Sequence, residues 1–239
     1  SSPFDKTSVD FLDSIGTPAY KIASFEITDI PLIEYAASKG KPVIISTGIA
    51  GKSDIEEAME ACRKAGNDSI ALLKCTSAYP APLKEMNLKT IPDMAEAFKT
   101  VVGLSDHGLS LSVPVAAAAL GAKIIEKHFI LERSLGGPDA AFSLEPREFK
   151  EMAKAVREAE EALGETTYEL TEAAKRHREF SRSLFSVMDI KKGEAFTGDN
   201  VRSIRPGYGM HPRHLKEILG RKAARDIKRG EPLRREMIE

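Results

Sequence analysis

Two short apolar runs of this sequence end in side chains suited to acid–base or metal chemistry. The run "IIEKHF" contains Glu126 and His128, and the run "GLSDH" contains Ser105 and His107. Side chains alternate between the faces of a β-strand, so each His shares a face with the polar residue two positions before it. On parallel strands about 4.8 Å apart, the two imidazoles can converge on one ion. With oxygen ligands nearby, they favour a catalytic divalent metal such as Mn²⁺ or Zn²⁺. The alternative is that each His is a hydrogen-bonded residue at the rim of a sheet.

A lysine and several hydroxyl groups end three earlier apolar runs. Lys21 and Ser24 stand in "KIAS", Ser46 in "ISTG" and Ser77 in "KCTS". A cation with hydroxyls, beside Gly48 that lets the backbone approach closely, is the kind of cradle that binds a phosphate. An unpaired ammonium inside an apolar strand is costly, so Lys21 is expected to meet an anion. The alternative for the hydroxyls is ordinary capping of strand ends.

Two longer loops, after the third and fifth predicted strands, each carry one candidate residue. Tyr79 stands in "SAYPAP" and Asp139 in "LGGPDAAFSLEP", where glycines and proline predict a shaped turn. Asp139 is expected to bind a sugar hydroxyl, with a turn or capping role as the alternative. Cys62 and Cys75 are expected to pack in the core, because no base is within reach of either thiol.

These residues are set in a regular alternation of strands and helices. The predicted strands are 19–24, 42–48, 70–77, 101–107 and 123–129, and the clearest helices are 53–66, 113–122 and 145–164. Ser53 is expected to cap the first of these helices. Repeated βα units predict a parallel sheet, and no Gly-x-Gly-x-x-Gly follows any strand to support dinucleotide binding. Polar residues at the carboxyl end of every strand favour a TIM-type (β/α)₈ barrel.

Five βα units are fewer than the eight that such a barrel needs. We therefore expect residues 1–164 to be the C-terminal part of a longer barrel whose first strands are absent from this chain. Residues 165–182 are expected to form a charged helical linker. The short β segments of residues 183–239 predict a small β-rich domain. Within it, "IKKGEAFTGDNV" and "IKRGEPLRREMI" form a pseudo-repeat. A domain of about 57 residues has little core of its own and is expected to dock on a partner.

Composition narrows the class of protein further. The net charge of −1, with 42% hydrophobic and 30% charged residues, gives no reason to expect binding to nucleic acid or to a membrane surface. No apolar run approaches the ~20 residues that span a bilayer. With only two cysteines and no secretory signal pattern, a cytoplasmic location is expected.

Taken together, the motifs resemble the sialic acid synthase family. The resemblance covers residues 1–239 and rests on the order of "KIAS", "ISTG", "KCTSAYPAP", "GLSDH", "IIEKHF", "GGPD", "SLEP" and "SIRPGYG". Two stretches, "RSLGGPDAAFSLEP" and "KCTSAYPAP", are more similar to the pseudaminic acid branch than to the N-acetylneuraminate branch, which would have Asn where Ser77 stands. The tail is similar to the SAF (antifreeze-like) domain.

The resemblance implies a metal-dependent condensation of phosphoenolpyruvate with 2,4-diacetamido-2,4,6-trideoxy-altrose. The product would be a nine-carbon 2-keto sugar acid, with release of phosphate. The alternative within the family is an N-acetylneuraminate or legionaminate synthase with an N-acetylmannosamine-type acceptor. Two further alternatives are a metal-dependent aldolase or related ketoacid synthase on the same barrel, and a carbohydrate- or partner-binding module on a degenerate barrel, without turnover.

The resemblance also implies roles for particular residues. His107 and His128 would bind the metal, usually Mn²⁺, with Mg²⁺, Co²⁺ or Zn²⁺ as alternatives. Phosphoenolpyruvate would be held by four side chains, Lys21, Ser24, Ser46 and Ser105. The acceptor sugar would be positioned for catalysis by Glu126, Tyr79 and Asp139. Arg205 would contact the sugar bound to the other subunit of a homodimer. Relatives also use a Glu and a Lys from the first barrel strands, so these 239 residues alone are expected to be inactive.

Overall fold

A computed structural model describes all residues from 1 to 239 and divides the chain into two compact units. The first unit is Ser1–Glu165 and the second is Thr166–Glu239. Each unit has its own cluster of buried apolar side chains, and each is described by itself. None of the helices combines the length and the apolar composition needed to cross a bilayer.

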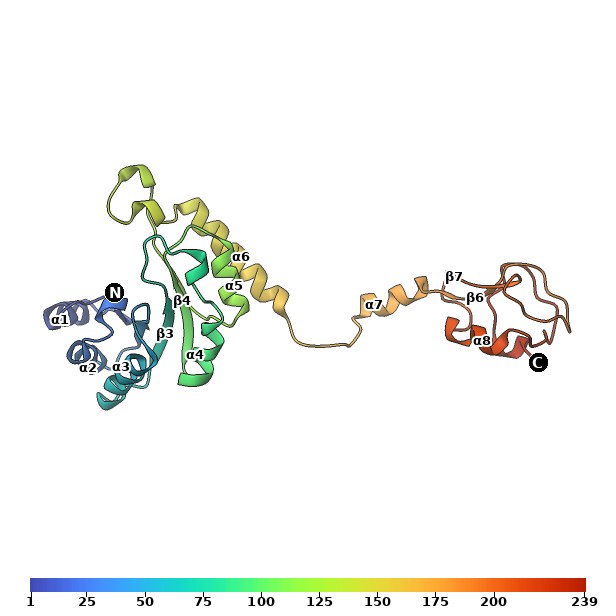
Figure 1. Cartoon of the computed structure of the whole chain (residues 1–239), viewed down its shortest axis with the longest axis horizontal. Helices are drawn as coiled ribbons and strands as arrows, with labels where there is room; N and C mark the ends of the chain where they lie inside the picture. The colour runs from blue at the N-terminus through green and yellow to red at the C-terminus, as the bar shows by residue number, and fades with distance from the viewer. The chain divides into compact units, whose positions relative to one another are not determined.

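The first unit is built on a five-stranded parallel sheet with the strand order β1-β2-β3-β4-β5. The strands are β1 (Tyr20–Ile22), β2 (Val43–Ser46), β3 (Ile70–Cys75), β4 (Val101–Asp106) and β5 (Ile125–Lys127). Each strand lies beside the next one in the sequence, which is the order of a barrel and not of a doubly wound sheet. The sheet is open and forms part of a TIM-type barrel, as predicted (Figure 1).

Six α-helices accompany this sheet: α1 (Lys6–Ser14), α2 (Ile30–Ala37), α3 (Lys52–Lys64), α4 (Thr90–Phe98), α5 (Ser112–Ala119) and α6 (Pro146–Leu163). Neighbouring helices pack in pairs, α2 with α3 and α5 with α6. The predicted cap of α3 is wrong, because the helix begins at Lys52 and its N-cap is Gly51. The carboxylate of Asp54 accepts the N–H of Gly51 at 2.8 Å, so an acid three residues into the helix replaces the expected Ser53 hydroxyl.

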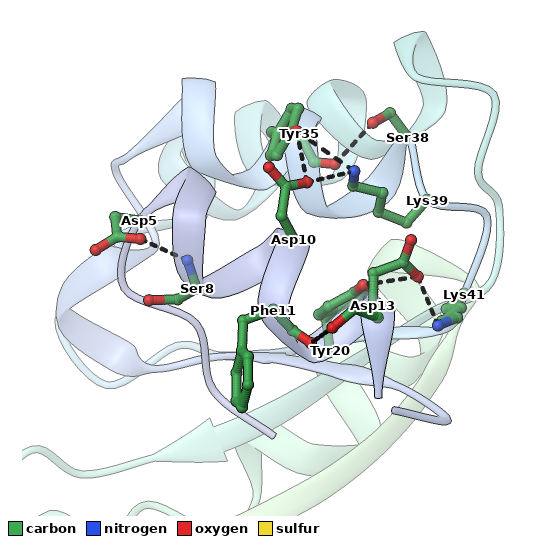
Figure 2. Close-up of polar contacts among 11 residues, drawn as sticks. Asp5, Ser8, Asp10, Phe11, Asp13, Tyr20, Tyr35, Ser38, Lys39 and Lys41 are labelled. Atoms are coloured by element: carbon green, nitrogen blue, oxygen red, sulfur yellow. Dashed lines mark hydrogen bonds and ion pairs between the residues drawn. The ribbon is translucent and has the colours of Figure 1, made fainter. Parts of the chain in front are cut away.

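Polar contacts tie α1 to the elements that follow it (Figure 2). Oδ1 of Asp10 accepts the hydroxyl of Tyr35 and the ammonium of Lys39, both at 2.7 Å. Oδ1 of Asp13 accepts the ammonium of Lys41 at 2.6 Å, just before β2. The lysine hydrogen bonds lower the pKa of both aspartates. Because exposed ion pairs contribute little free energy, the buried apolar face of α1 stabilises this contact more than the ion pairs do.

Strands β4 and β5 place the polar residues through strict alternation. Val102 and Leu104 of β4 are buried in the apolar core of the unit, so Gly103 and Ser105 face the opposite side. A Cβ on Gly103 would lie 2.4 Å from the carbonyl oxygen of Ile124. Glycine therefore permits the close approach of β4 and β5 that brings their carboxyl ends together.

The second unit contains α7 (Glu172–His177), β6 (Ser183–Ser186), β7 (Val201–Ile204) and α8 (Leu215–Ile218). The two strands pair antiparallel, and isolated bridges connect the remaining extended segments. Its core consists of nine buried side chains: Leu184, Ile190, Phe196, Val201, Ile218, Ala223, Ile227, Leu233 and Met237. The small size of this core agrees with a domain of limited independent stability.

The pseudo-repeat of the sequence is visible in the hydrogen bonds of the second unit. Ile190 and Ile227 exchange a reciprocal pair of backbone hydrogen bonds at 2.9 and 2.8 Å. Each repeat then turns at a glycine with positive φ, Gly193 at 82° and Gly230 at 88°. In both turns a glutamate carboxylate accepts the N–H three residues before it. The two repeats therefore form the same turn and face each other.

Candidate active site

A cavity of about 330 Å³ lies at the carboxyl ends of the parallel strands. Most of the residues singled out in the sequence line it, namely Lys21, Ser24, Ser46, Tyr79, Ser105, His107, Glu126 and His128. They come from all five strands or the loops that follow them. This is the end of a parallel barrel at which enzymes of this architecture place their catalytic groups.

The two imidazoles lie together, with ring centroids 5.2 Å apart. Nδ1 of His107 is 2.9 Å from the carbonyl oxygen of Thr76. A carbonyl oxygen only accepts, so Nδ1 carries the proton and Nε2 of the neutral ring keeps its lone pair. Burial lowers the pKa of His107, which favours the neutral ring that a metal needs. Donation from the other ring nitrogen to a backbone carbonyl is the usual support of a metal-binding histidine.

Aromatic rings surround the two imidazoles. Tyr79 stacks on His107 with centroids 4.3 Å apart and an angle of 24° between the planes. Phe142 contacts His128 edge-on at 4.9 Å. Oδ2 of Asp139 lies 3.4 Å from Nδ1 of His128. Phe142 was missed in the sequence; an apolar residue three positions after Asp139 in a glycine-rich loop was the available signal.

Glu126 connects the two halves of the cavity. Its Oε1 accepts the hydroxyl of Ser105 at 2.6 Å and lies 3.5 Å from Nζ of Lys21. Lys21 belongs to β1 and Glu126 to β5, the two edge strands of the sheet. Their ion pair shows that the sheet curves strongly enough for both edges to point side chains at one axis. The anion expected beside Lys21 is thus a carboxylate of the chain itself.

A group of hydroxyls forms the opposite wall of the cavity. Ser77 does not line the cavity itself, but its Oγ donates to the Oγ of Ser24, which does, at 2.8 Å. The hydroxyl of Ser46 is buried and has no hydrogen-bond partner. A Cβ on Gly48 would lie 2.2 Å from Ser77 Oγ and 2.9 Å from Cys75 Sγ. Only glycine fits at position 48, because the side chains of Ser24, Cys75 and Ser77 already pack against its Cα. The buried, unpartnered hydroxyl of Ser46 indicates a place where a polar group of a ligand could bind.

The side chains fit a divalent metal only in part. Nowhere in the chain do three or more His, Cys, Asp and Glu side chains gather in a way that could hold a metal ion. A closed structural zinc site, which needs four protein ligands, is therefore excluded. The two imidazoles fit a metal that takes its remaining ligands from oxygen atoms of water or substrate.

The two cysteines and Arg205, which the sequence analysis also considered, lie in different parts of the structure. Cys75 is buried, as expected, but lines the cavity, and burial raises the pKa of its thiol. Cys62 lies on the buried face of α3 and does not line the cavity. Arg205 belongs to the second unit, where it directly follows β7 with an exposed side chain.

A larger cavity of about 790 Å³ opens near the amino ends of β2, β3 and β4. Its lining is mainly apolar, with Val43, Ile70, Ala71 and Val102 among the residues that form it. It contains no histidine and no convergent set of polar groups. In barrels this end of the strands carries residues of structural importance, so the smaller polar cavity is the candidate active site.

The fold and this cavity define a parallel barrel protein with its functional groups at the strand ends. Comparison with known proteins gives the family. Residues 1–168 match the NeuB family, and residues 181–239 match the SAF domain. The chain belongs to the NeuB family of sialic acid synthases and carries a C-terminal SAF domain.

Individual relatives agree with this assignment. The chain is 47% identical over 234 residues to a pseudaminic acid synthase of Campylobacter jejuni, covering 98% of this chain and 68% of that protein. It is 40% identical over 237 residues to an N,N'-diacetyllegionaminic acid synthase of the same species, covering 98% of this chain and 71% of that protein. The crystal structure of the spore coat polysaccharide biosynthesis protein SpsE of Bacillus subtilis superimposes with a TM-score of 0.66 at 39% identity. That match covers 100% of this chain and 72% of the SpsE chain.

Proposed function

We propose that this protein is a pseudaminic acid synthase. In this proposal it condenses phosphoenolpyruvate with 2,4-diacetamido-2,4,6-trideoxy-altrose to a nine-carbon 2-keto sugar acid and releases phosphate. The observation that carries the proposal is the cavity at the strand ends, where one wall presents a cation and hydroxyls and the other presents two imidazoles. The higher identity to the pseudaminic acid synthase than to the legionaminic acid synthase supports this choice of acceptor.

Phosphoenolpyruvate would bind at the wall formed by Lys21, Ser24, Ser46 and Ser105. Lys21 supplies the positive charge, and its side chain is only 14% exposed, so water screens its attraction for an anion weakly. The orphaned Ser46 hydroxyl would gain the hydrogen bond that it lacks in this structure. Gly48 lets the hydroxyls of Ser24 and Ser77 pack closely against the backbone after β2. These contacts would hold the enol carbon of phosphoenolpyruvate in a fixed position toward the sugar.

The imidazoles of His107 and His128 would hold a divalent metal, most often Mn²⁺ in relatives, with Mg²⁺, Co²⁺ or Zn²⁺ as alternatives. When bound, it supplies a Lewis acid that makes the aldehyde carbon of the open-chain sugar electrophilic. The chain's own residues orient the two reactants. Tyr79 and Phe142 shield the imidazoles from one side, and Asp139 beside His128 would accept a hydroxyl of the sugar.

The bond changes follow from the reactants. The enol carbon of phosphoenolpyruvate forms a C–C bond with the aldehyde carbon, and the aldehyde oxygen takes up a proton. Water then adds to C2, and phosphate leaves with cleavage of its bond to that carbon. Glu126 accepts a hydrogen bond from Ser105 and lies close to Lys21, so it would position the sugar between the phosphoenolpyruvate wall and the imidazoles.

We also propose a homodimer in which the SAF domain of one subunit reaches the active site of the other. Charge supports this part of the proposal. Residues 1–165 contain 18 Lys and Arg against 25 Asp and Glu, a net charge of −7. Residues 166–239 contain 17 against 11, a net charge of +6. Opposite charges favour the association of unlike units from two copies. Arg205, exposed after β7, would contact the acceptor sugar.

Turnover is proposed to require a closed barrel. Five strands leave β1 and β5 as open edges, whereas a barrel of this type closes with eight. The isolated 239 residues are therefore expected to form no product. A cytoplasmic location completes the proposal and is supported by two buried, unpaired cysteines; cell fractionation would test it.

The reaction is tested by measuring phosphate release from the complete protein with phosphoenolpyruvate, Mn²⁺ and a panel of amino sugars. Release with the 2,4-diacetamido-trideoxy-altrose, and none when pyruvate replaces phosphoenolpyruvate, is expected. The second result separates the synthase from an aldolase. Release with N-acetylmannosamine but not with the altrose sugar would contradict the proposed acceptor and support an N-acetylneuraminate synthase. Sugar binding without release would support a binding module.

A further inference from the structure

Asp106 and Lys127 form an ion pair that solvent does not reach. Nζ of Lys127 lies 2.8 Å from Oδ2 of Asp106, and both side chains are 0% exposed. The two residues are direct partners in the register of β4 and β5. The neighbouring register pair is Ser105 with Glu126, which faces the cavity. The ion pair therefore lies on the opposite face of the same two strand ends.

The ion pair also closes the turn that follows β4. Oδ1 of Asp106 accepts the N–H of Gly108 at 2.9 Å, and Nζ of Lys127 donates to the carbonyl oxygen of Gly108. In the sequence His107 lies between Asp106 and Gly108, and His128 directly follows Lys127. The contacts among these three residues thus fix the backbone on which both imidazoles stand.

Stability alone does not account for such a pair. Removing two charges from water costs free energy, and well-packed apolar residues of similar volume often stabilise a fold equally well or better. Apolar side chains, however, allow one strand to slide along the other. A charged pair with two further hydrogen bonds requires one distance and one orientation between its partners. The pair is suited to fixing the strand ends relative to each other.

We infer that Asp106 and Lys127 are positioning residues that set the spacing of His107 and His128 for a shared divalent cation. This inference rests on the proposed function, because it requires that the two imidazoles bind a metal. The ion pair acts through the backbone of β4, β5 and the turn at Gly108.

The test is a double variant, Asp106→Asn with Lys127→Met, in the complete protein. It removes both charges together, so no unpaired charge is left buried, and the amide oxygen of the substituted asparagine can still accept the Gly108 N–H. A matched control, Asp13→Asn with Lys41→Met, makes the same chemical changes in the ion pair that joins α1 to the segment before β2 (Figure 2). Affinity for Mn²⁺ alone is measured by titration calorimetry, and the thermal midpoint is measured without metal.

The double variant is expected to bind Mn²⁺ about tenfold more weakly or worse, while the control binds like the parent. Parental Mn²⁺ affinity in the folded double variant would overturn the inference, whatever its thermal midpoint. A parent protein that does not bind Mn²⁺ overturns both the inference and the metal site of the proposed function, and that result is visible before any variant is made.

A second variant keeps the inference testable when the double variant does not fold. A Cβ on Gly108 would lie 3.3 Å from Oδ1 of Asp106 and 3.4 Å from Cε of Met86. Gly108→Ala therefore requires the carboxylate of Asp106 to shift by a few tenths of an ångström, which perturbs the ion pair and keeps both charges. A smaller loss of Mn²⁺ affinity in the same direction is expected, and an unchanged affinity would overturn the inference.

Discussion

Gly48→Ala tests the ligand-binding wall of the cavity with a single methyl group. The added Cβ would lie 2.2 Å from Ser77 Oγ, 2.7 Å from Ser24 Oγ and 2.9 Å from Cys75 Sγ. Real Cβ atoms essentially never come closer than 3.0 Å to another heavy atom. The hydroxyls of Ser24 and Ser77 must therefore move away from the added methyl group, and we expect this to disrupt their 2.8 Å hydrogen bond.

Two effects on stability follow from this displacement. Overpacking costs about 1–3 kcal/mol, and the lost hydrogen bond costs about 1 kcal/mol. The expected decrease in the free energy of unfolding is therefore about 2–4 kcal/mol. For a unit of this size, each kcal/mol lowers the thermal midpoint by about 2–4 °C.

The effect on ligand binding is expected to be larger than a loss of stability explains. A hydrogen bond to a charged group contributes about 1.5–3 kcal/mol, so displacing one hydroxyl should weaken phosphoenolpyruvate binding about tenfold to a hundredfold. Titration calorimetry with phosphoenolpyruvate and Mn²⁺ measures this at a temperature where the variant is folded. The matched control is Gly198→Ala, where no atom lies within 4 Å of the added Cβ. Parental affinity in folded Gly48→Ala would refute the assignment of this wall to phosphoenolpyruvate.

Three further predictions concern other parts of the molecule. His107→Ala is expected to abolish stoichiometric Mn²⁺ binding, since one imidazole leaves the site with a single nitrogen ligand; metal analysis after dialysis measures this, and retained metal would exclude His107 as a ligand. The hydrogen bond from Arg133 lowers the pKa of Glu148 from 4.5 to about 2, so this ion pair stabilises the fold fully above about pH 4.5 and is lost as the pH falls through about 2. Glu148→Gln should therefore lower the thermal midpoint at neutral pH but not in strong acid near the lowered pKa, and an equal decrease at both would contradict the ion pair as the cause. Arg205→Ala is expected to raise the KM for the acceptor sugar and to leave Mn²⁺ affinity unchanged; an unchanged KM would remove Arg205 from the sugar site.

Much of the secondary structure of the first unit was predictable, because it depends on sequence patterns among neighbouring residues. Each strand is a short apolar run with polar residues at its carboxyl end, and all five predicted strands occur in the structure. The alternation of β4 and β5 that the sequence predicts agrees with their register, in which Ser105 is paired with Glu126. The N-cap of α3 was misplaced by two residues, because local preference favours Ser53 over Gly51, whereas in the structure the carboxylate of Asp54 accepts the N–H of a Gly51 cap.

The features that were not predictable depend on contacts between distant segments. Phe142 lies in a loop, and only its contact with His128 places it in the site. Alternation places the side chain of Lys127 on the other face of β5 from Glu126, but its fully buried pairing with Asp106 depends on the register between β4 and β5. Sequence patterns describe the face on which a side chain lies and not the partner that it meets there.

By itself, the sequence determined the order of strands and helices, the face of each strand that is polar, and the set of residues available for chemistry. These properties depend on side-chain periodicity and on short-range preferences of the backbone. Only the tertiary structure decided that Lys21 of β1 meets Glu126 of β5, and that the hydroxyl of Ser46 is left without a partner. Both depend on the curvature of the whole sheet, which is set by packing among residues far apart in the chain.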